Sequence, residues 1–139
     1  MENKTQRHRG TEETIYYYDE ELTGSIIKCA IEIHRHLGPG LLESAYEECL
    51  CHELSLHKIP FLRQKPLPLE YKGIKLDCGY RMDMVVDNKV VVELKCVDKI
   101  TSVHEAQLLT YLRLSKIKTG LIINFYTDVL KQGIKRLVL

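Results

Sequence analysis

The sequence has no apolar run near the roughly 20 residues that a helix needs to cross a membrane. Its N-terminal segment, MENKTQRHRGTEET, is polar and contains no apolar signal core, which predicts a cytoplasmic protein without membrane contact. Internal repeats, linkers and low-complexity tracts are also absent. A chain of 139 residues can bury roughly two-thirds of its unfolded surface in one core. We therefore expect a single domain over residues 1–139, with residues 1–18 as a partly disordered extension.

The five cysteines form no CxxC pair, and their number is odd. Their spacing gives no zinc or redox motif, so we expect reduced and mostly buried thiols. A metal site stays open as an alternative if Cys78 and Cys96 meet across a sheet. The cysteines thus indicate no disulfide framework.

Acidic and basic side chains are almost equal in number, since the net charge is only +1. The distribution is uneven, because residues 1–57 carry five basic and eleven acidic side chains, whereas residues 113–139 carry six basic and one acidic. The six basic residues at the C-terminal end are Arg113, Lys116, Lys118, Lys131, Lys135 and Arg136. This asymmetry fits a phosphate-bearing ligand that approaches one side, and it also fits an ordinary solvated surface.

Hydrophobic periodicity predicts alternating helices and strands. Apolar residues spaced by three and four predict one helix over about 22–37 and a second after the Gly38-Pro39-Gly40 break. Period-two patterns predict strands around a Lys72-Gly73 turn and a hairpin over 80–97. A third helix opens with a capping box formed by Ser102 and Glu105. The apolar run after Gly120 and a short segment after Gly133 complete the pattern as strands, which predicts an α/β protein with a mixed central sheet flanked by helices.

The hairpin over residues 80–97 carries charged residues in an otherwise apolar stretch. If Asp87-Asn88-Lys89 forms its turn, Asp83 lies directly opposite Glu93 on the partner strand. A turn of only two residues would pair Asp83 with Val92 and put the two acids on opposite faces. The interpretation of this hairpin therefore depends on one residue of register.

Like charges that face each other destabilise a hairpin, which predicts a divalent cation between Asp83 and Glu93. An ordinary explanation stays open: a cross-strand ion pair, Asp83 with Lys95 or Arg81 with Glu93, would contribute less than about 1 kcal/mol on a solvated face. Valine residues flank the acids on that face, so an enclosed acid pair would need a cation or a raised pKa. Two carboxylates and a strand carbonyl would suit Mg²⁺ and the hydrolysis of a phosphodiester.

The predicted helices bring further polar residues. Glu43 and Tyr46 lie three apart, so they are neighbours on one helix face close to the apolar side. Glu43 in a first helical turn would also favour the positive end of the helix dipole, which alone could explain it. Gln107 and Tyr111 share a face of the third helix and would help to position substrate or water. Lys95 would orient the attacking water or contact the phosphate as a point charge.

These residues resemble the PD-(D/E)XK nuclease superfamily: Asp83, then Glu93-Leu94-Lys95 at the end of a hairpin, then Gln107 on the next helix. In addition, the segment GLLESAY at 40–46 reproduces the Gly-x-x-Glu-x-x-Tyr signature of the bacterial and archaeal GxxExxY family. The segments RMD, VVELK, QLLTYLR and GLIINF also resemble blocks of that family, so the resemblance covers about residues 22–139. It implies a restriction-endonuclease-like fold with an α-β-β-β-α-β core.

The resemblance also implies a function, a nuclease that uses Mg²⁺ or Mn²⁺ to hydrolyse nucleic acid, with DNA as the expected substrate. The implied catalytic residues are Glu43, Asp83, Glu93, Lys95 and Gln107. The implied metal ligands are Asp83, Glu93 and the Leu94 carbonyl, with Glu43 as an additional acid. The expected substrate contacts are Tyr46, Arg81, Tyr111 and Arg113. The alternatives are an inactive nuclease-fold module that binds nucleic acid or regulates a protein partner, and a small-molecule metal hydrolase. A homodimer or a protein partner is a candidate source of specificity.

Overall fold

The computed structural model describes residues 19–139, so the predicted extension at 1–18 lies outside the described residues. None of the helices in the described range has the length and apolar character to cross a membrane. The helices are α2 (Glu20–Leu37), α3 (Glu43–Leu56), α4 (Ser102–Ser115) and the short 3-10 helix η2 (Leu130–Gly133). The strands are β1 (Phe61–Pro66), β2 (Leu69–Tyr71), β3 (Ile74–Leu76), β4 (Arg81–Val86), β5 (Val90–Lys95), β6 (Thr119–Asn124) and β7 (Ile134–Val138).

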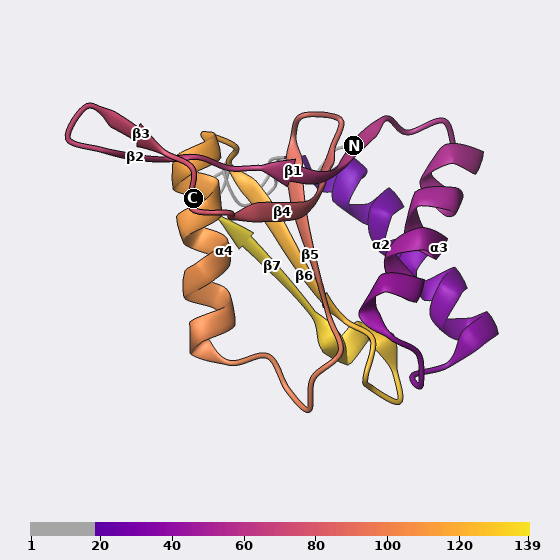
Figure 1. The fold of residues 1–139 in the computed structure, drawn as a ribbon. Coiled ribbons are helices and arrows are strands. Elements are labelled where there is room, and N and C mark those ends of the chain that lie inside the picture. Colours follow the sequence, from indigo (N-terminus) through magenta and orange to yellow (C-terminus); the bar gives the residue numbers. More distant parts are fainter. Residues whose placement is uncertain (1–18) are drawn as a thin grey trace, which may run out of the picture.

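Five strands form one mixed sheet in the order β1-β4-β5-β6-β7 (Figure 1). Strands β5 and β6 run parallel, and the other neighbouring pairs are antiparallel. A parallel pair needs a crossover connection, which α4 supplies. The structure thus confirms the predicted α/β class with a mixed central sheet flanked by helices.

Helices cover both faces of this sheet (Figure 1). Helices α2 and α3 share a buried core with Met84 and Val86 of β4, whereas α4 shares a second core with Val85 and with Val91 of β5. Strand β5 is buried from Val90 to Leu94. A central strand covered on both faces needs apolar residues at nearly every position. The charged residues Glu93 and Lys95 at the end of β5 depart from this pattern.

Strands β2 and β3 form a separate hairpin that projects beyond the main sheet (Figure 1). Its turn, Lys72-Gly73, has positive φ angles of 48° and 83°, as a type I′ hairpin turn requires. One edge strand of the main sheet is β1, whose middle residues, Arg63-Gln64-Lys65, are all polar. Period-two patterning therefore does not identify β1, although β1 pairs with β4 in one register on both sides of Gln64, which has a positive φ of 49°.

The predicted capping box of α4 is wrong by one residue. Thr101 is the N-cap residue instead of Ser102, and its side-chain oxygen accepts a hydrogen bond from the backbone N–H of His104 (3.3 Å). In return, the backbone N–H of Thr101 donates to Nδ1 of His104 (3.0 Å). The box therefore uses a histidine where the sequence pattern pointed to Glu105.

All five cysteines are free thiols, as expected. Cys29 and Cys51 are buried, whereas Cys78 is exposed. In the part of the chain that the structure describes, Cys78 and Cys96 belong to no group of three metal-ligating side chains. The alternative of a metal site between these two cysteines is therefore not supported.

Candidate active site

The way in which the two strands of the β4–β5 hairpin are connected changes at Asp83 and Glu93. Backbone pairing runs from the turn to Met84 and Val92 and ends there, one residue before the acids. Beyond this point side chains connect the strands, since the N–H of Asp83 donates to Oε2 of Glu93 (3.0 Å) and the N–H of Leu94 donates to Oδ2 of Asp83 (2.9 Å). The predicted register is thus confirmed, and the two carboxylates lie together where the backbone ladder ends.

Both carboxyl groups lie in surroundings that disfavour their charge. Glu93 is only 7% exposed, and its burial together with the charge of Asp83 raises its pKa to about 8. Burial also raises the pKa of Asp83, and the charges of Glu47 and Glu43 act in the same direction. Within residues 19–139, neither Asp83 nor Glu93 forms an ion pair. A cation between them would favour the charged form of both.

Lys95 and the carbonyl of Leu94 adjoin the two acids. Lys95 follows Glu93 by two residues, so it lies on the same face of β5. Its charge lowers the pKa of both Asp83 and Glu93, which indicates that its ammonium group is close to them. The N–H of Leu94 donates to Asp83, and the carbonyl of a strand residue points to the same edge as its N–H. The Leu94 carbonyl is therefore directed toward the acids.

Glu43 reaches the end of β5 from the first residue of α3. Its side chain is exposed, and Oε2 accepts a hydrogen bond from the backbone N–H of Cys96 (3.2 Å), the residue after β5. Its charge raises the pKa of Asp83 and of Glu93. In the described chain, the carboxylates of Glu43, Asp83 and Glu93 do not form a group with all ligand atoms within 4.8 Å of one another. Glu43 therefore lies at the rim of the acidic pair and connects α3 to β5.

Glu47, one turn after Glu43, is an acid of this site that sequence reasoning missed. Helical patterning places it off the apolar stripe, yet it is only 8% exposed. Its carboxylate accepts hydrogen bonds from Nε of Arg63 (2.9 Å) and Nε2 of Gln64 (3.0 Å) on β1. Its charge raises the pKa of Asp83. The one signal in the sequence is its spacing of four residues from Glu43, which puts both acids on one side of α3.

Helix α4 contributes Gln107 and Tyr111. Nε2 of Gln107 donates to the hydroxyl of Tyr111 (3.0 Å), so the two side chains are held together on one face of α4. Burial and the charge of Glu93 raise the pKa of Tyr111, which indicates that its hydroxyl lies near the acids. Both side chains also line an open cavity of about 430 Å³. Its other lining residues are Leu69, Tyr80, Val103, Ala106, Thr110 and Leu114.

Arg81 and Arg113 are both exposed but lie in different places. Arg81 comes two residues before Asp83 on β4, so it lies on the face of the acids. Arg113 lies in the last turn of α4, where its guanidinium donates to the hydroxyl of Thr110 (3.1 Å). Because Thr110 lines the cavity, Arg113 is next to the cavity and Arg81 is next to the acids.

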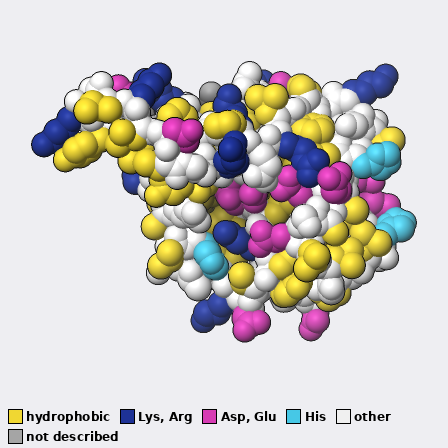
Figure 2. Space-filling model, viewed as in Figure 1, with side chains coloured by type: hydrophobic (Ala, Val, Ile, Leu, Met, Phe, Trp, Pro, Cys, Tyr) yellow, Lys and Arg dark blue, Asp and Glu magenta, His cyan; other side chains and the backbone are white. Residues whose placement is uncertain are grey.

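The C-terminal basic residues do not form one groove beside the acids. Lys116 and Lys118 flank the start of β6, whereas Lys95 pairs with Asn124 at the other end of that strand. Figure 2 shows Lys and Arg side chains along the projecting hairpin, and Asp and Glu side chains gathered in the middle of the same face. The basic groups near the acids along the sheet thus include Lys95 on β5 and, on β1, Arg63 and Lys65, which pair with Met84 and Met82 on either side of Asp83.

Tyr46, the tyrosine of the Gly-x-x-Glu-x-x-Tyr segment, lies in the core. It is 0% exposed, and its ring stacks on Phe125 with the centroids 4.1 Å apart. Its hydroxyl donates to the carbonyl of Gly38 and accepts from the N–H of Leu41 (3.1 Å). Because it has no exposed surface, we correct the predicted contact with substrate to a structural role: Tyr46 holds the loop that leads into Glu43.

Tyr46→Phe should lower the free energy of unfolding by about 1–3 kcal/mol, because the N–H of Leu41 loses its acceptor while the stacked ring stays. Urea denaturation followed by circular dichroism measures this. The matched control is Tyr71→Phe on the exposed strand β2, which should leave the denaturation midpoint unchanged. A Tyr46→Phe protein of unchanged stability would contradict the structural role.

One comparison with known proteins gives a match. A family model of the PD-(D/E)XK nuclease superfamily matches residues 20–137. The comparisons with curated proteins and with solved structures give no match. Along the chain, the elements α3, β1, β4, β5, α4 and β6 follow one another in the order that a restriction-endonuclease-like fold requires, and the strands among them belong to the mixed sheet. Nucleases of this superfamily generally depend on a divalent metal. With a match over nearly its whole length, the chain belongs to the PD-(D/E)XK nuclease superfamily.

Proposed function

We propose that this protein is a nuclease that hydrolyses phosphodiester bonds with the help of Mg²⁺ or Mn²⁺, and that DNA is its substrate. The observation that carries the proposal is the pair Asp83 and Glu93, which are partly or largely buried at the end of the β4–β5 ladder and form no ion pair with any described residue. In its charged form this pair is only partly compensated by Lys95, and such a pair costs stability. Such a cost is expected where a cation and a substrate complete the site.

The donor atoms suit a hard cation. The carboxylates of Asp83 and Glu93 and the carbonyl of Leu94 offer only oxygen, the ligand type that Mg²⁺ and Mn²⁺ prefer. When bound, such a cation would lower the pKa of a water molecule and stabilise the charge that develops on the phosphate. Because the pKa of Glu93 is about 8 in the protein without metal, protons compete for this site at neutral pH.

The other polar residues of the site have separate roles in this proposal. Lys95, on the same face as the acids, would orient the attacking water or contact the phosphate as a point charge. Glu43 would fix the end of β5 through its hydrogen bond to Cys96. Gln107 would orient the hydroxyl of Tyr111, which supports the site from α4.

The nucleic acid would approach from the side of the β2–β3 hairpin. Arg81 lies on the face of the acids, and Lys72 and Lys75 are exposed on the hairpin, where they would meet phosphate groups. The cavity beside Tyr111 contains a second aromatic ring, Tyr80. A base that has left its stack could enter there, and stacking on an aromatic side chain contributes about 1–3 kcal/mol per base. We therefore expect single-stranded or frayed DNA to be cleaved faster than intact duplex.

The two acids also favour a nuclease over the alternative, an inactive module that only binds nucleic acid. Carboxylates repel the phosphate backbone, so a protein that only binds nucleic acid would bind better without Asp83 and Glu93. A homodimer or a protein partner would still be compatible with the enzyme, because specificity can reside outside the chemical site.

Incubation of the purified full chain with duplex DNA, single-stranded DNA and RNA tests the proposal. We expect cleavage with Mg²⁺ or Mn²⁺ and none with a chelator, and calorimetry should detect metal binding without nucleic acid. Absence of both cleavage and metal binding would refute the proposal. Salt-dependent nucleic-acid binding without cleavage would instead favour the inactive module.

A further inference from the structure

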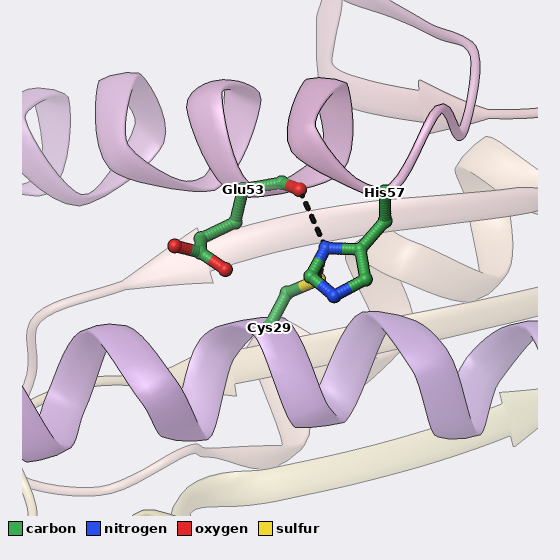
Figure 3. A group of neighbouring side chains, drawn as sticks. All are labelled: Cys29, Glu53 and His57. Carbon is green, nitrogen blue, oxygen red and sulfur yellow. Dashed lines mark hydrogen bonds between the residues drawn. The ribbon is translucent and has the colours of Figure 1, made fainter.

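A second group of metal-ligating side chains lies between α2 and the end of α3. Cys29 comes from α2, Glu53 from the last turn of α3, and His57 from the position that follows this helix (Figure 3). One ligand atom of each lies within 4.8 Å of the other two, and no other group of three in residues 19–139 meets this distance. Glu53 is ten residues beyond Glu43 on one helix, about 15 Å along its axis, so this group is separate from the nuclease site.

The sulfur and the imidazole are already spaced as ligands of one ion. Sγ of Cys29 lies 3.8 Å from Nδ1 of His57. Two ligands at tetrahedral angles on zinc, one sulfur at about 2.3 Å and one nitrogen at about 2.0 Å, would be about 3.5 Å apart. The distance between the two atoms is therefore within a few tenths of an ångström of the distance that one ion requires.

The histidine can turn to a metal without leaving a backbone group unpaired. Nδ1 of His57 lies 2.9 Å from the carbonyl oxygen of Glu53. Because a carbonyl only accepts, Nδ1 carries the proton in the metal-free protein. The same carbonyl also accepts the backbone N–H of His57 (3.1 Å). It thus keeps a partner when Nδ1 loses its proton and binds a metal ion.

The donor set selects a borderline metal. Thiolate and imidazole are ligands of zinc, whereas Mg²⁺ takes oxygen almost exclusively. Cys29 is 2% exposed, and burial raises the pKa of its thiol, an effect to which the charge of Glu53 adds. A thiolate at this position therefore needs a positive partner. His57 is exposed, so an ion can reach the site from solvent. A water molecule would take the fourth coordination position of the ion.

We propose that Cys29, Glu53 and His57 bind one Zn²⁺ ion, which ties α2 to the end of α3. Binding would release the thiol proton of Cys29 to solvent. The neutral imidazole of His57 would keep one proton, which would move through solvent from Nδ1 to Nε2 and leave Nδ1 to the ion. The site is independent of the proposed nuclease activity, because none of its residues contacts Asp83 or Glu93.

The groove beside this group supplies matched controls. A cavity of about 410 Å³ between α2 and α3 is lined by Cys49, His52 and Glu53, among others. Cys49 and His52 match two of the proposed ligands in residue type and lie on the same helix as Glu53, but they are outside the group of three.

The full chain, freed of metal with a chelator, should be titrated with Co²⁺ and then with Zn²⁺. Co²⁺ bound through sulfur gives a charge-transfer absorption in the near ultraviolet, which Zn²⁺ should displace at one ion per chain. Cys29→Ser should abolish this absorption, and His57→Ala should weaken Zn²⁺ binding at least about tenfold. Because His57 is exposed, its replacement leaves the core intact and keeps the test valid even if Cys29→Ser does not fold.

Cys49→Ser, His52→Ala and the double variant Asp83→Asn/Glu93→Gln should give the same near-ultraviolet absorption with Co²⁺ as the wild type, because this absorption reports ligation by sulfur. In the double variant, which lacks the two acids proposed to bind Mg²⁺ or Mn²⁺, Zn²⁺ should raise the melting temperature, and the additional substitution His57→Ala should remove this rise. No near-ultraviolet absorption with Co²⁺ in the wild type would overturn the proposal. Loss of binding in Cys49→Ser or His52→Ala, with binding kept in His57→Ala, would overturn it too, because the ion would then lie in the groove.

Discussion

Alanine at Asp83, Glu93 or Lys95, one at a time, should reduce metal-dependent DNA cleavage at least about a thousandfold while the fold stays intact. Asp83 and Glu93 meet where the β4–β5 ladder ends, so removal of either leaves one carboxylate for the cation. Among residues 19–139, Lys95 is a cation whose charge lowers the pKa of both acids, and its truncation to alanine removes this charge from the site. Initial rates of plasmid nicking with Mg²⁺ and with Mn²⁺ measure the loss, and circular dichroism verifies folding.

The three variants should differ in metal binding, which separates their roles. Calorimetry should show no binding of Mg²⁺ or Mn²⁺ to Asp83→Ala or Glu93→Ala. Lys95→Ala should keep or strengthen this binding, because it removes a positive charge beside the cation. If Lys95→Ala loses cleavage but still binds the metal, Lys95 acts as proposed, by orienting the attacking water or by contacting the phosphate.

Controls come from the turn of the same hairpin. Asp87 and Lys89 pair with each other (3.7 Å) in this turn, so Asp87→Asn and Lys89→Ala should leave cleavage unchanged. Asparagine is chosen at position 87 because φ is +52° there, a conformation that asparagine tolerates. Metal-dependent cleavage that persists in Asp83→Ala or Glu93→Ala would contradict the assignment of these acids.

The register of this hairpin could be predicted from the sequence because the turn and the apolar pattern agree. Asp87 and Asn88 both have positive φ, and the N–H of Lys89 donates to the carbonyl of Val86 (2.9 Å). Val86 nevertheless pairs with Val90, so Lys89 is an extra residue between the turn and the ladder, as in a bulge. This one residue places the acids opposite each other.

Glu47 could not be predicted because its burial depends on a distant strand. Arg63 and Gln64, which bond its carboxylate, lie 16 and 17 residues later on β1. Helical periodicity reports only which face of α3 is apolar, and an acid off this face is ordinarily solvated. The pairing of β1 with β4 brings Arg63 to Glu47, and that pairing is a tertiary event.

Tyr46 and Thr101 illustrate a second limit of prediction from sequence. The correct segment is identified in both cases, but a residue in it is given the wrong role. A signature marks Tyr46 as important without distinguishing a core residue from a surface one. Thr101 and Ser102 are both good N-cap residues, and local sequence does not decide between them. In the structure, the side chain of His104 reaches back to the N–H of Thr101, which fixes the start of α4.

Glu93→Gln should make the metal-free protein more stable at alkaline pH. In the folded protein the pKa of Glu93 is about 8, compared with its ordinary value of 4.5. The folded state therefore holds a proton that the unfolded state releases between pH 4.5 and 8, so stability falls as pH rises through this window. Glutamine stays neutral and can still accept the hydrogen bond from the N–H of Asp83. At pH 9 in a chelator, the variant should be more stable by a few kcal/mol, a rise in melting temperature on the order of 10 °C.

The difference in melting temperature should shrink as pH falls and vanish near pH 4, where Glu93 is protonated in both states of the wild type. With Mg²⁺ at pH 9 it should shrink or reverse, because the cation stabilises the wild type and the variant has lost a ligand. Glu70→Gln on the exposed strand β2 is the control and should behave like the wild type throughout. A Glu93→Gln protein that is less stable than the wild type at pH 9 in a chelator would show that burial and the charge of Asp83 do not destabilise the charged form of Glu93, and the argument for a cation between the acids would lose its physical basis.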